Sequence, residues 1–410
     1  MVMRYQVRRT IRVGLMVLLA GAAACGKESA DGEPASVRRD SSGVEIVINH
    51  APAWEEPQRW PGREPPLVQI GSVDGAPQYQ LAQVRGLLRL PDGRVALADF
   101  GSLQVRFYAA DGTFLSSTGR QGAGPGEFQS LGYLGPYRED SLVVWDWRLR
   151  RVSIFDDSGH FGRQVILQGG AMVPALAGAL GDGSFIATNS GIFGNETQSG
   201  LRRDTTFIFR HAADGAFLDT VAVLPGEETY IHVGENSVTS MQLPFGRRAF
   251  VAVADSGVYA GASDRYEIRW YSPAGELRRI IRRDVPVRPV DDSMIAVYKR
   301  KDEEAMLGNP RLDDRTREYL GQLRNEIPFP TTMPAFGDLK TDRAGNLWVQ
   351  AYLAPGDTSA APWTVFDSTG QMLGQMTLPS RFRLQSLDAG AIAGVWFDAN
   401  DVEYARVYGE

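Results

Sequence analysis

The chain has 410 residues, 43% of them hydrophobic and 22% charged, which is ordinary for a globular protein. Its 45 glycines and 23 prolines indicate many turns and argue against a mainly helical fold. The formal net charge is −6, and it becomes −10 without the first 24 residues, which contain four arginines and no acid. So acidic a chain lacks the basic surface that phosphates require, which argues against nucleic acid as a partner.

The N-terminus has the pattern of an export signal. Four arginines precede an apolar run over residues 13–24, and twelve residues are too few for a membrane-spanning helix of about 20. Small residues at positions 21–24 lie immediately before Cys25, which is the one cysteine of the chain. This order of charged, apolar and small residues predicts a secretory signal peptide over residues 1–24.

The junction at Cys25 resembles a bacterial lipobox. The resemblance implies that the signal is cut before Cys25 and that this residue is acylated, so that the exported protein is anchored to a bacterial membrane at the cell envelope. The alternative is an unmodified cysteine in an ordinary signal peptide. Residues 25–43 are polar, contain Gly, Ser and Pro, and lack aromatic residues, which predicts a flexible tether.

A unit of strands and tight turns repeats from residue 87 onward. In the clearest copy, a strand ends at Asp92-Gly93, and strands over 95–99 and 104–108 lead to a second turn at Asp111-Gly112. Asp and Gly tolerate the left-handed backbone of tight hairpins, and alternating apolar residues fix the strand register. The first turn recurs near residues 92, 140, 182, 255, 343 and 388. Its short intervals, 42 to 48 residues, match one four-stranded propeller blade.

The six units predict an all-β protein, a six-bladed β-propeller over residues 44–410. The last unit has three strands, so we expect an N-terminal strand to complete it and close the ring. Residues 67–70 are the first candidate for that strand, and residues 44–48 are the alternative. A β-sandwich is the alternative fold, but it does not predict a three-strand remainder at one end and a lone strand at the other.

Residues 122–128, Gly-Ala-Gly-Pro-Gly-Glu-Phe, link the first two units. This link and the strands before it resemble the NHL-type six-bladed propellers. Residues 43–410 as a whole resemble the bacterial six-bladed β-propeller lipoproteins. The resemblance implies a fold, with the aromatic of the link plugging the next blade, and it implies no settled activity. Related propellers carry a divalent ion at the channel, so it also leaves open a metal-dependent lactonase or lyase.

Residues 286–334 interrupt the repeat between the fourth and fifth units. Asp291 or Asp292 can cap a helix that runs through Met306, and a second helix is expected over residues 313–326. Prolines at 328, 330 and 334 end it. This helical insertion is expected to brace the propeller, and the alternative is a lid that gates a site or meets a partner.

Few residues suggest a site. Asp99, Asp146 and Asn189 end the second strand of three units, so their oxygens are candidate ligands for a single divalent cation such as calcium. The alternative is that each side chain binds backbone amides of its own unit. Trp147 is a candidate pocket residue. His232 is a further candidate, although the spacing of the four histidines does not indicate zinc.

Paired arginines at 278–279 and 282–283 flank two isoleucines in an outer strand, which predicts protection of a sheet edge rather than a binding patch. No catalytic motif is present, and Cys25 is committed to the anchor. We therefore expect a binding or scaffolding module for a protein, peptide or glycan, and not an enzyme. The alternatives are the metal-dependent lactonase or lyase and a glycan or peptide sensor with the insertion as its lid.

Overall fold

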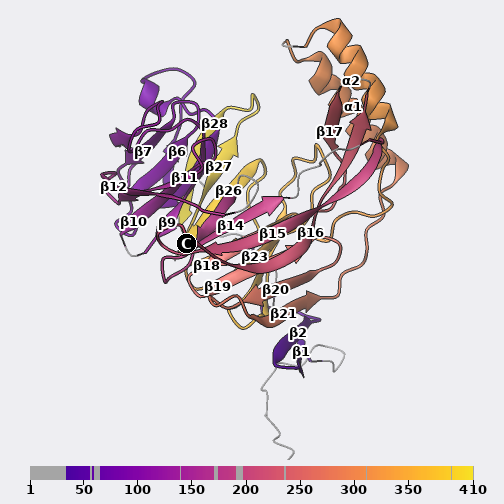
Figure 1. Cartoon of the computed structure of the whole chain (residues 1–410), viewed down its shortest axis with the longest axis horizontal. Helices are drawn as coiled ribbons and strands as arrows, with labels where there is room; N and C mark the ends of the chain where they lie inside the picture. The colour runs from indigo at the N-terminus through magenta and orange to yellow at the C-terminus, as the bar shows by residue number, and fades with distance from the viewer. Residues whose placement is uncertain are drawn as a thin grey trace, which may run out of the picture.

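The computed structural model describes residues 34–55, 58–59, 65–138, 140–169, 174–190, 197–234, 237–310, 312–388 and 390–409. Cys25 and the predicted signal peptide lie outside these residues. The described chain is all-β except for a 3-10 helix, η1 (Pro77–Tyr79), and two α-helices, α1 (Asp292–Leu307) and α2 (Asp314–Glu326) (Figure 1). Within these ranges, no helix has both the length and the apolar character needed to cross a membrane.

The strands of the described residues form six sheets, which we number in chain order. Sheet 1 contains β5 (Val84–Arg89), β6 (Val95–Asp99), β7 (Gln104–Tyr108) and β8 (Phe114–Thr118). Sheet 2 contains β9 (Leu131–Tyr137), β10 (Ser141–Asp146), β11 (Arg151–Asp156) and β12 (Phe161–Ile166). Sheet 3 contains β13 (Ala175–Ala179), β14 (Phe185–Ser190), β15 (Gly200–His211), β16 (Phe217–Val233) and β17 (Val238–Gln242).

The remaining sheets also take in strands from the N-terminal segment. Sheet 4 contains β18 (Ala249–Ala254), β19 (Gly257–Ala262), β20 (Glu267–Tyr271), β21 (Leu277–Arg283), β2 (Val44–Asn49) and β1 (Ser36–Ser41). Sheet 5 contains β22 (Asp338–Thr341), β23 (Leu347–Gln350), β24 (Pro362–Phe366), β25 (Met372–Thr377) and β3 (Gln58–Arg59). Sheet 6 contains β26 (Phe382–Asp388), β27 (Ala391–Phe397), β28 (Glu403–Gly409) and β4 (Val68–Ile70).

Tight turns join neighbouring strands where the sequence predicts them. Between β5 and β6, the N–H of Gly93 donates to the carbonyl of Leu90 at 2.9 Å, and Gly93 has a φ of +90°. Glycine adopts this left-handed conformation without the steric penalty of a Cβ atom. The same bond to the carbonyl three residues earlier recurs at Gly112, Gly159, Gly183, Gly215, Gly275, Gly345 and Gly370. The predicted turns at these glycines are therefore confirmed.

Each sheet packs face to face against the next through a buried apolar cluster. Phe107 of sheet 1 and Phe155 of sheet 2 share one cluster, and four similar clusters fill the junctions from sheet 2 to sheet 6. Another cluster joins Val395 of sheet 6 to Leu87 of sheet 1. The first strands also touch in cyclic order: β5, β9, β13, β18, β22, β26 and again β5. This closed cycle is a propeller-like arrangement.

Strand β4 supplies the edge of sheet 6 that the sequence predicts to be missing. It pairs antiparallel with β28, with Ile70 opposite Ala405 and Val68 opposite Val407. The side chain of Ile70 is buried in the cluster between sheets 6 and 1. The prediction that residues 67–70 complete the last sheet is confirmed, and the alternative strand, residues 44–48, forms β2 in sheet 4 instead.

Part of the predicted tether is ordered β-structure. Residues 36–41 form β1, which pairs antiparallel with β2, and β2 runs parallel to β21 at the outer side of sheet 4. The turn between them contains Ser42 and Gly43, both at positive φ, and the Gly43 N–H donates to Asp40 Oδ1 at 3.2 Å. The prediction of a tether through residue 43 is therefore wrong for residues 36–43, because turn residues and linker residues have the same composition.

The two predicted helices of the insertion are confirmed. Asp291 caps α1 by accepting the N–H of Met294, and Asp313 caps α2 by accepting the N–H of Thr316. Each carboxylate satisfies an N–H that has no partner within its helix. The observed ends, Leu307 and Glu326, lie within one residue of those expected from the sequence.

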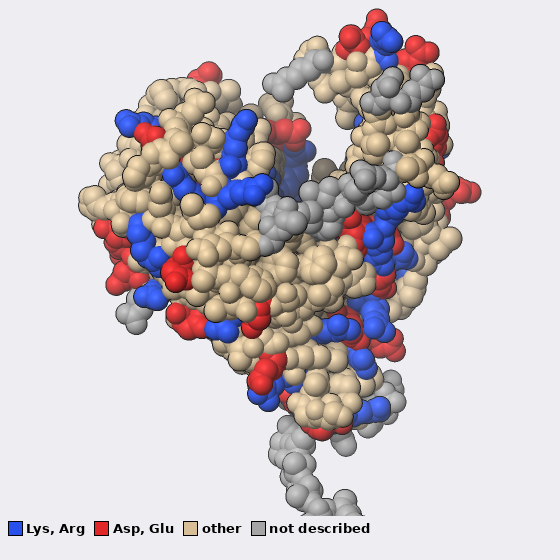
Figure 2. Space-filling view, in the orientation of Figure 1, with Lys and Arg blue, Asp and Glu red and all other residues tan. Residues whose placement is uncertain are grey.

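The insertion leaves and re-enters the body through a narrow neck between sheets 4 and 5. There, the Met333 N–H donates to the Arg288 carbonyl at 2.9 Å, and the Val290 N–H donates to the Thr331 carbonyl at 3.0 Å. Figure 1 shows α1 and α2 beside β17, where the β15–β16 hairpin extends beyond the other sheets. In the space-filling view, a gap separates this projection from the sheets across from it, and basic side chains are visible beside the gap (Figure 2).

Candidate functional site

The two aspartates predicted from the repeat are buried among donors of their own sheets. Asp99 Oδ1 accepts the N–H groups of Ala82 and Gly101, at 3.2 and 3.1 Å. Asp99 Oδ2 accepts the Ser102 hydroxyl at 3.0 Å and lies 2.9 Å from Arg106 Nη2. The carboxylate therefore fixes the loop after β6 and the entry to β5.

Asp146 has the same role in sheet 2. Its Oδ2 accepts the N–H groups of Gln129 and Ser130, at 2.6 and 3.0 Å. Its Oδ1 accepts those of Arg148 and Leu149, at 3.0 and 2.9 Å. Because N–H donors surround both oxygens, this carboxylate does not fit a calcium site, which needs oxygens free to face the ion. The structural role, which the sequence left as an alternative, accounts for these contacts.

The other predicted site residues are not gathered at one place. Trp147 follows β10 in sheet 2 and is 52% exposed. Asn189 is buried in sheet 3, where it pairs with Phe207 in the β14–β15 ladder. Among the described residues, no group of three or more His, Cys, Asp or Glu is placed to hold a metal ion.

His232 contacts the helical insertion. Its Nδ1 lies 3.0 Å from Oε2 of Glu326, and its ring meets the Tyr319 ring edge-on at 6.4 Å between centroids. The hydroxyl of Tyr230 lies 3.4 Å from the same Glu326 oxygen. Desolvation, with a smaller contribution from the Glu326 charge, raises the pKa of Tyr230. These residues join β16 to α2.

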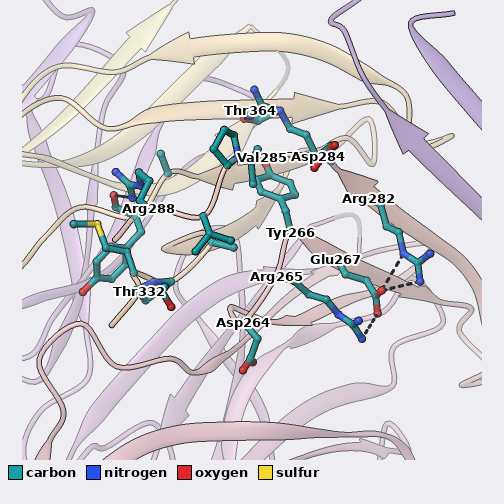
Figure 3. Close-up of a pocket in the computed structure, with 18 of the residues that line it drawn as sticks. Asp264, Arg265, Tyr266, Glu267, Arg282, Asp284, Val285, Arg288, Thr332 and Thr364 are labelled. Atoms are coloured by element: carbon teal, nitrogen blue, oxygen red, sulfur yellow. Dashed lines mark hydrogen bonds and ion pairs between the residues drawn. The ribbon is translucent and has the colours of Figure 1, made fainter. Parts of the chain in front are cut away.

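A pocket of about 680 Å³ lies at the foot of the insertion, between sheets 4 and 5 (Figure 3). This volume suits a small-molecule ligand. Strands β20 and β21 of sheet 4 and both arms of the neck contribute most of the wall. Sheet 5 and the end of β2, which is also in sheet 4, complete it. The lining includes residues 264–267, 282–288 and 332–335, together with Tyr352, Thr364, Gln375, Ile48 and His50.

A buried carboxylate collects arginines on one side of this pocket. Glu267 is 7% exposed, and its Oε2 lies 2.9 Å from Arg282 Nη2. Its Oε1 lies 3.3 Å from Arg269 Nη2 and 3.6 Å from Arg265 Nη2. Figure 3 shows Arg265 and Arg282 reaching Glu267 from opposite sides. The cluster has three positive charges around one negative charge, because Arg is always protonated.

A second acid of the lining is already neutralised. Asp264 binds Arg203 with two contacts of 2.6 Å, one through each oxygen. This hydrogen-bonded pair holds the pKa of Asp264 below its ordinary value, although burial opposes the shift. Two parallel N–H···O bonds of this kind are among the stronger polar contacts in proteins.

Tyr266 forms the buried back of the pocket. Its hydroxyl has no hydrogen-bond partner among the described residues, and burial raises the pKa of Tyr266 to about 12, opposed by nearby Thr364 and Arg283. The Arg283 guanidinium lies over the Tyr266 ring, 5.8 Å from its centroid, and Nη1 donates to Thr364 Oγ1 at 3.1 Å. An arginine held over an aromatic face gains a cation–π contact.

Arg288 lies on the neck side of the pocket. Its Nη2 donates to the carbonyl of Tyr352 at 2.8 Å. Burial raises the pKa of Tyr352 to about 12, and the charges of Arg248 and Arg288 oppose this rise. Arg288 is exposed at the mouth, whereas Tyr352 is half-buried, so the guanidinium is held near the entrance.

The expectation that the paired arginines at 278–279 and 282–283 protect a sheet edge is wrong. Strand β21 is not an edge strand, because β2 pairs with it and β1 lies beyond. Arg279 binds Glu45 of β2 at 2.6 Å, and Arg282 and Arg283 line the pocket. Two arginines at the end of a strand, next to the start of a long insertion, are the signal that could have located this site.

No protein-family model and no curated protein matches the chain. Among solved structures, a protein described as exported, from Bacteroides fragilis NCTC 9343, aligns with 89% of this chain and 99% of its own at a TM-score of 0.45 and 11% identity. A DUF4221 family member from Bacteroides vulgatus aligns with 84% of this chain and 97% of its own, at a TM-score of 0.46 and 8% identity. A gluconolactonase from Xanthomonas campestris aligns with 81% of this chain and 87% of its own, at a TM-score of 0.39 and 13% identity. Values this low establish neither a family nor an activity.

Proposed function

We propose that the protein is a ligand-binding module of the bacterial cell envelope, a six-bladed propeller whose ligand enters the pocket between sheets 4 and 5. The observation that carries this proposal is the pocket itself. About 680 Å³ of space lies between two sheets and the neck of the insertion, and arginines and a buried tyrosine line it. Pockets that combine apolar walls with a few convergent polar groups are the usual binding sites of small ligands.

The cyclic packing of the six sheets supports the propeller assignment. The NHL-like link between sheets 1 and 2 supports it as well. Phe128 of that link is fully buried between these sheets, and its carbonyl accepts the N–H of Gly122 at 3.0 Å. Arg151 donates to the Ala123 carbonyl at 2.8 Å, which holds the link against β11. An aromatic plug of this kind is what the NHL resemblance implies.

The anchor is the second part of the proposal. Acylation of Cys25 would attach the protein to a membrane nine residues before Pro34, where the described chain begins. Nine extended residues span at most about 30 Å. Figure 1 shows β1 and β2 at the opposite end of the molecule from α1 and α2. The helical insertion would then face away from the membrane, toward a peptide, a glycan or another protein.

A thermal-shift experiment with a rim variant tests the pocket. Small molecules, peptides and glycan fragments from a bacterial envelope are screened for compounds that raise the melting temperature of the wild-type protein. Val287→Trp places a bulky ring at the pocket rim, at a residue that is 72% exposed. We expect the stabilising compounds to lose their effect on this variant. Equal stabilisation of both proteins, or no stabilising compound for the wild type, would contradict the proposal.

A further inference from the structure

The charges of the pocket are not balanced. Four arginines line it, at 265, 282, 283 and 288, against three acids, at 264, 267 and 284. Two of these acids already have partners: Arg203, outside the lining, neutralises Asp264, and Glu267 is shared by three arginines. The third, Asp284, is exposed. The pocket is therefore a positively charged place on a chain whose net charge is −6.

The four lining arginines fall into two pairs. Glu267 holds Arg265 and Arg282, whereas Arg283 and Arg288 have no carboxylate partner among the described residues. Arg283 donates to the Thr364 hydroxyl, and Arg288 donates to the Tyr352 carbonyl. A guanidinium has five N–H donors, so most donors of this second pair have no acceptor from the described protein.

The surroundings of Arg283 favour an anion at these open N–H donors. Its side chain is half-buried and lies over the Tyr266 ring, whose hydroxyl is also without a partner. Burying a cation without an opposing charge is unfavourable. An oxyanion can accept two N–H groups of one guanidinium in parallel, and it supplies the missing negative charge.

We propose that this pocket binds a small ligand with a carboxylate or phosphate group on a flat apolar body, with Arg283 donating to the oxyanion and Arg288 adding positive charge at the mouth. This inference rests on the proposed function and adds the chemical class of the ligand. The apolar body would lie against Val285, Pro334 and the rings of Tyr266 and Tyr352, which also line the pocket.

Three probes with one shared ring test the charge requirement. Benzoate and phenyl phosphate carry the two oxyanions, and benzyl alcohol is the neutral match. Binding to the full chain is measured by isothermal titration and by ligand-observed NMR at low and high salt. We expect each anion to bind at least tenfold more tightly than benzyl alcohol, with a difference that shrinks in high salt. The anion that binds more tightly indicates whether the charged group of the ligand is a carboxylate or a phosphate.

Variants locate the binding. Arg283→Gln should remove most of the preference for the anions, and Arg288→Gln should reduce it; the exposed Arg288 can be changed without disturbing the core. The control is Arg278→Gln in the same strand as Arg283, because Arg278 pairs with Glu276 and does not line the pocket. Circular dichroism and melting temperature show that each variant is folded.

The outcomes separate the two proposals. Equal binding of all three probes, lost in Val287→Trp, overturns the oxyanion inference and leaves the pocket as a binding site. Anion binding that survives in both Arg283→Gln and Arg288→Gln also overturns the inference. Anion binding that is unaffected by Val287→Trp would show that the anions bind outside this pocket, which contradicts the proposed location of the site as well.

Discussion

The Nδ1 atom of His232, near the end of β16, lies 3.0 Å from Oε2 of Glu326, the last residue of α2. The Tyr230 hydroxyl approaches the same oxygen at 3.4 Å. Apart from Leu323, the residues of α1 and α2 have no fully buried side chains. Because few side chains of the two helices are fully buried, these polar contacts to sheet 3 help to fix the position of the insertion.

We therefore expect Glu326→Ala to release the insertion locally. Cleavage by trypsin within residues 299–317 should become several-fold faster, because local opening exposes the backbone of weakly packed helices. The melting temperature should change little. Glu318→Ala, an exposed position on the same helix, is the control and should leave the cleavage rate unchanged. Equal rates for wild type and Glu326→Ala would show that this contact does not hold the insertion.

Asp146→Ala should destabilise the protein by about 3 kcal/mol or more, because it leaves buried N–H groups without an acceptor. Urea unfolding monitored by fluorescence measures the change. Asp140→Ala, at the exposed start of the same hairpin, should change the free energy of unfolding by less than about 0.5 kcal/mol. If Asp146 instead held calcium, EDTA would lower the melting temperature of the wild-type protein, and we expect it to have no effect.

Asn49→Ala should loosen the N-terminal segment. Asn49 is fully buried, its Nδ2 donates to the Gly370 carbonyl at 3.0 Å, and its Oδ1 accepts the Met372 N–H at 2.7 Å. Loss of both bonds between sheets 4 and 5 should cost about 2–3 kcal/mol. The exposed Asn400 serves as the control position. Hydrogen exchange at Met372 should rise in Asn49→Ala, and unchanged protection there would contradict the assignment.

Stability should depend on pH through His211. This residue is 1% exposed, its Nε2 lies 3.0 Å from the Gln168 carbonyl, and burial lowers the pKa of its imidazole below the ordinary 6.5. The unfolded chain therefore binds this proton more readily than the folded chain. Stability is fully present above about pH 6.5 and declines as the pH falls toward the lowered pKa of the folded state.

The variant His211→Gln should flatten that decline between pH 7 and pH 5, as measured by urea unfolding at several pH values. Glutamine can still donate a hydrogen bond but does not titrate. His160→Gln is the matched control, because the His160 side chain is 82% exposed. A slope that is unchanged in His211→Gln would rule out this residue as its source.

The features predicted correctly from the sequence are those that a few neighbouring residues determine. A turn such as Asp92-Gly93 and a cap such as Asp291 each depend on three or four neighbouring residues, so both can be predicted from the sequence. The missing strand of sheet 6 was predictable because one unit was visibly short. The hairpin at Ser42-Gly43 was missed because its residues also suit a linker.

Contacts between distant segments could not be predicted in the same way. The start of β15 is one example, because the strand begins at Gly200 and pairs along the long β16. Polar residues such as Arg202 gave no alternating pattern to reveal it. The pocket is built from sheets 4 and 5 and from the end of β2, so the role of Arg283 depends on neighbours far away in the chain.

The path of the N-terminal strands has a consequence for how the protein matures. Strands β2, β3 and β4 pair with β21, β25 and β28, and contacts such as Glu45–Arg279 and Gln69–Arg406 join positions 234 and 337 residues apart. The N-terminal strands are synthesised first, but they cannot pair until their C-terminal partners have been synthesised. If the chain crosses a membrane N-terminus first, its leading strands remain unpaired throughout the crossing, and the ring is completed only afterwards.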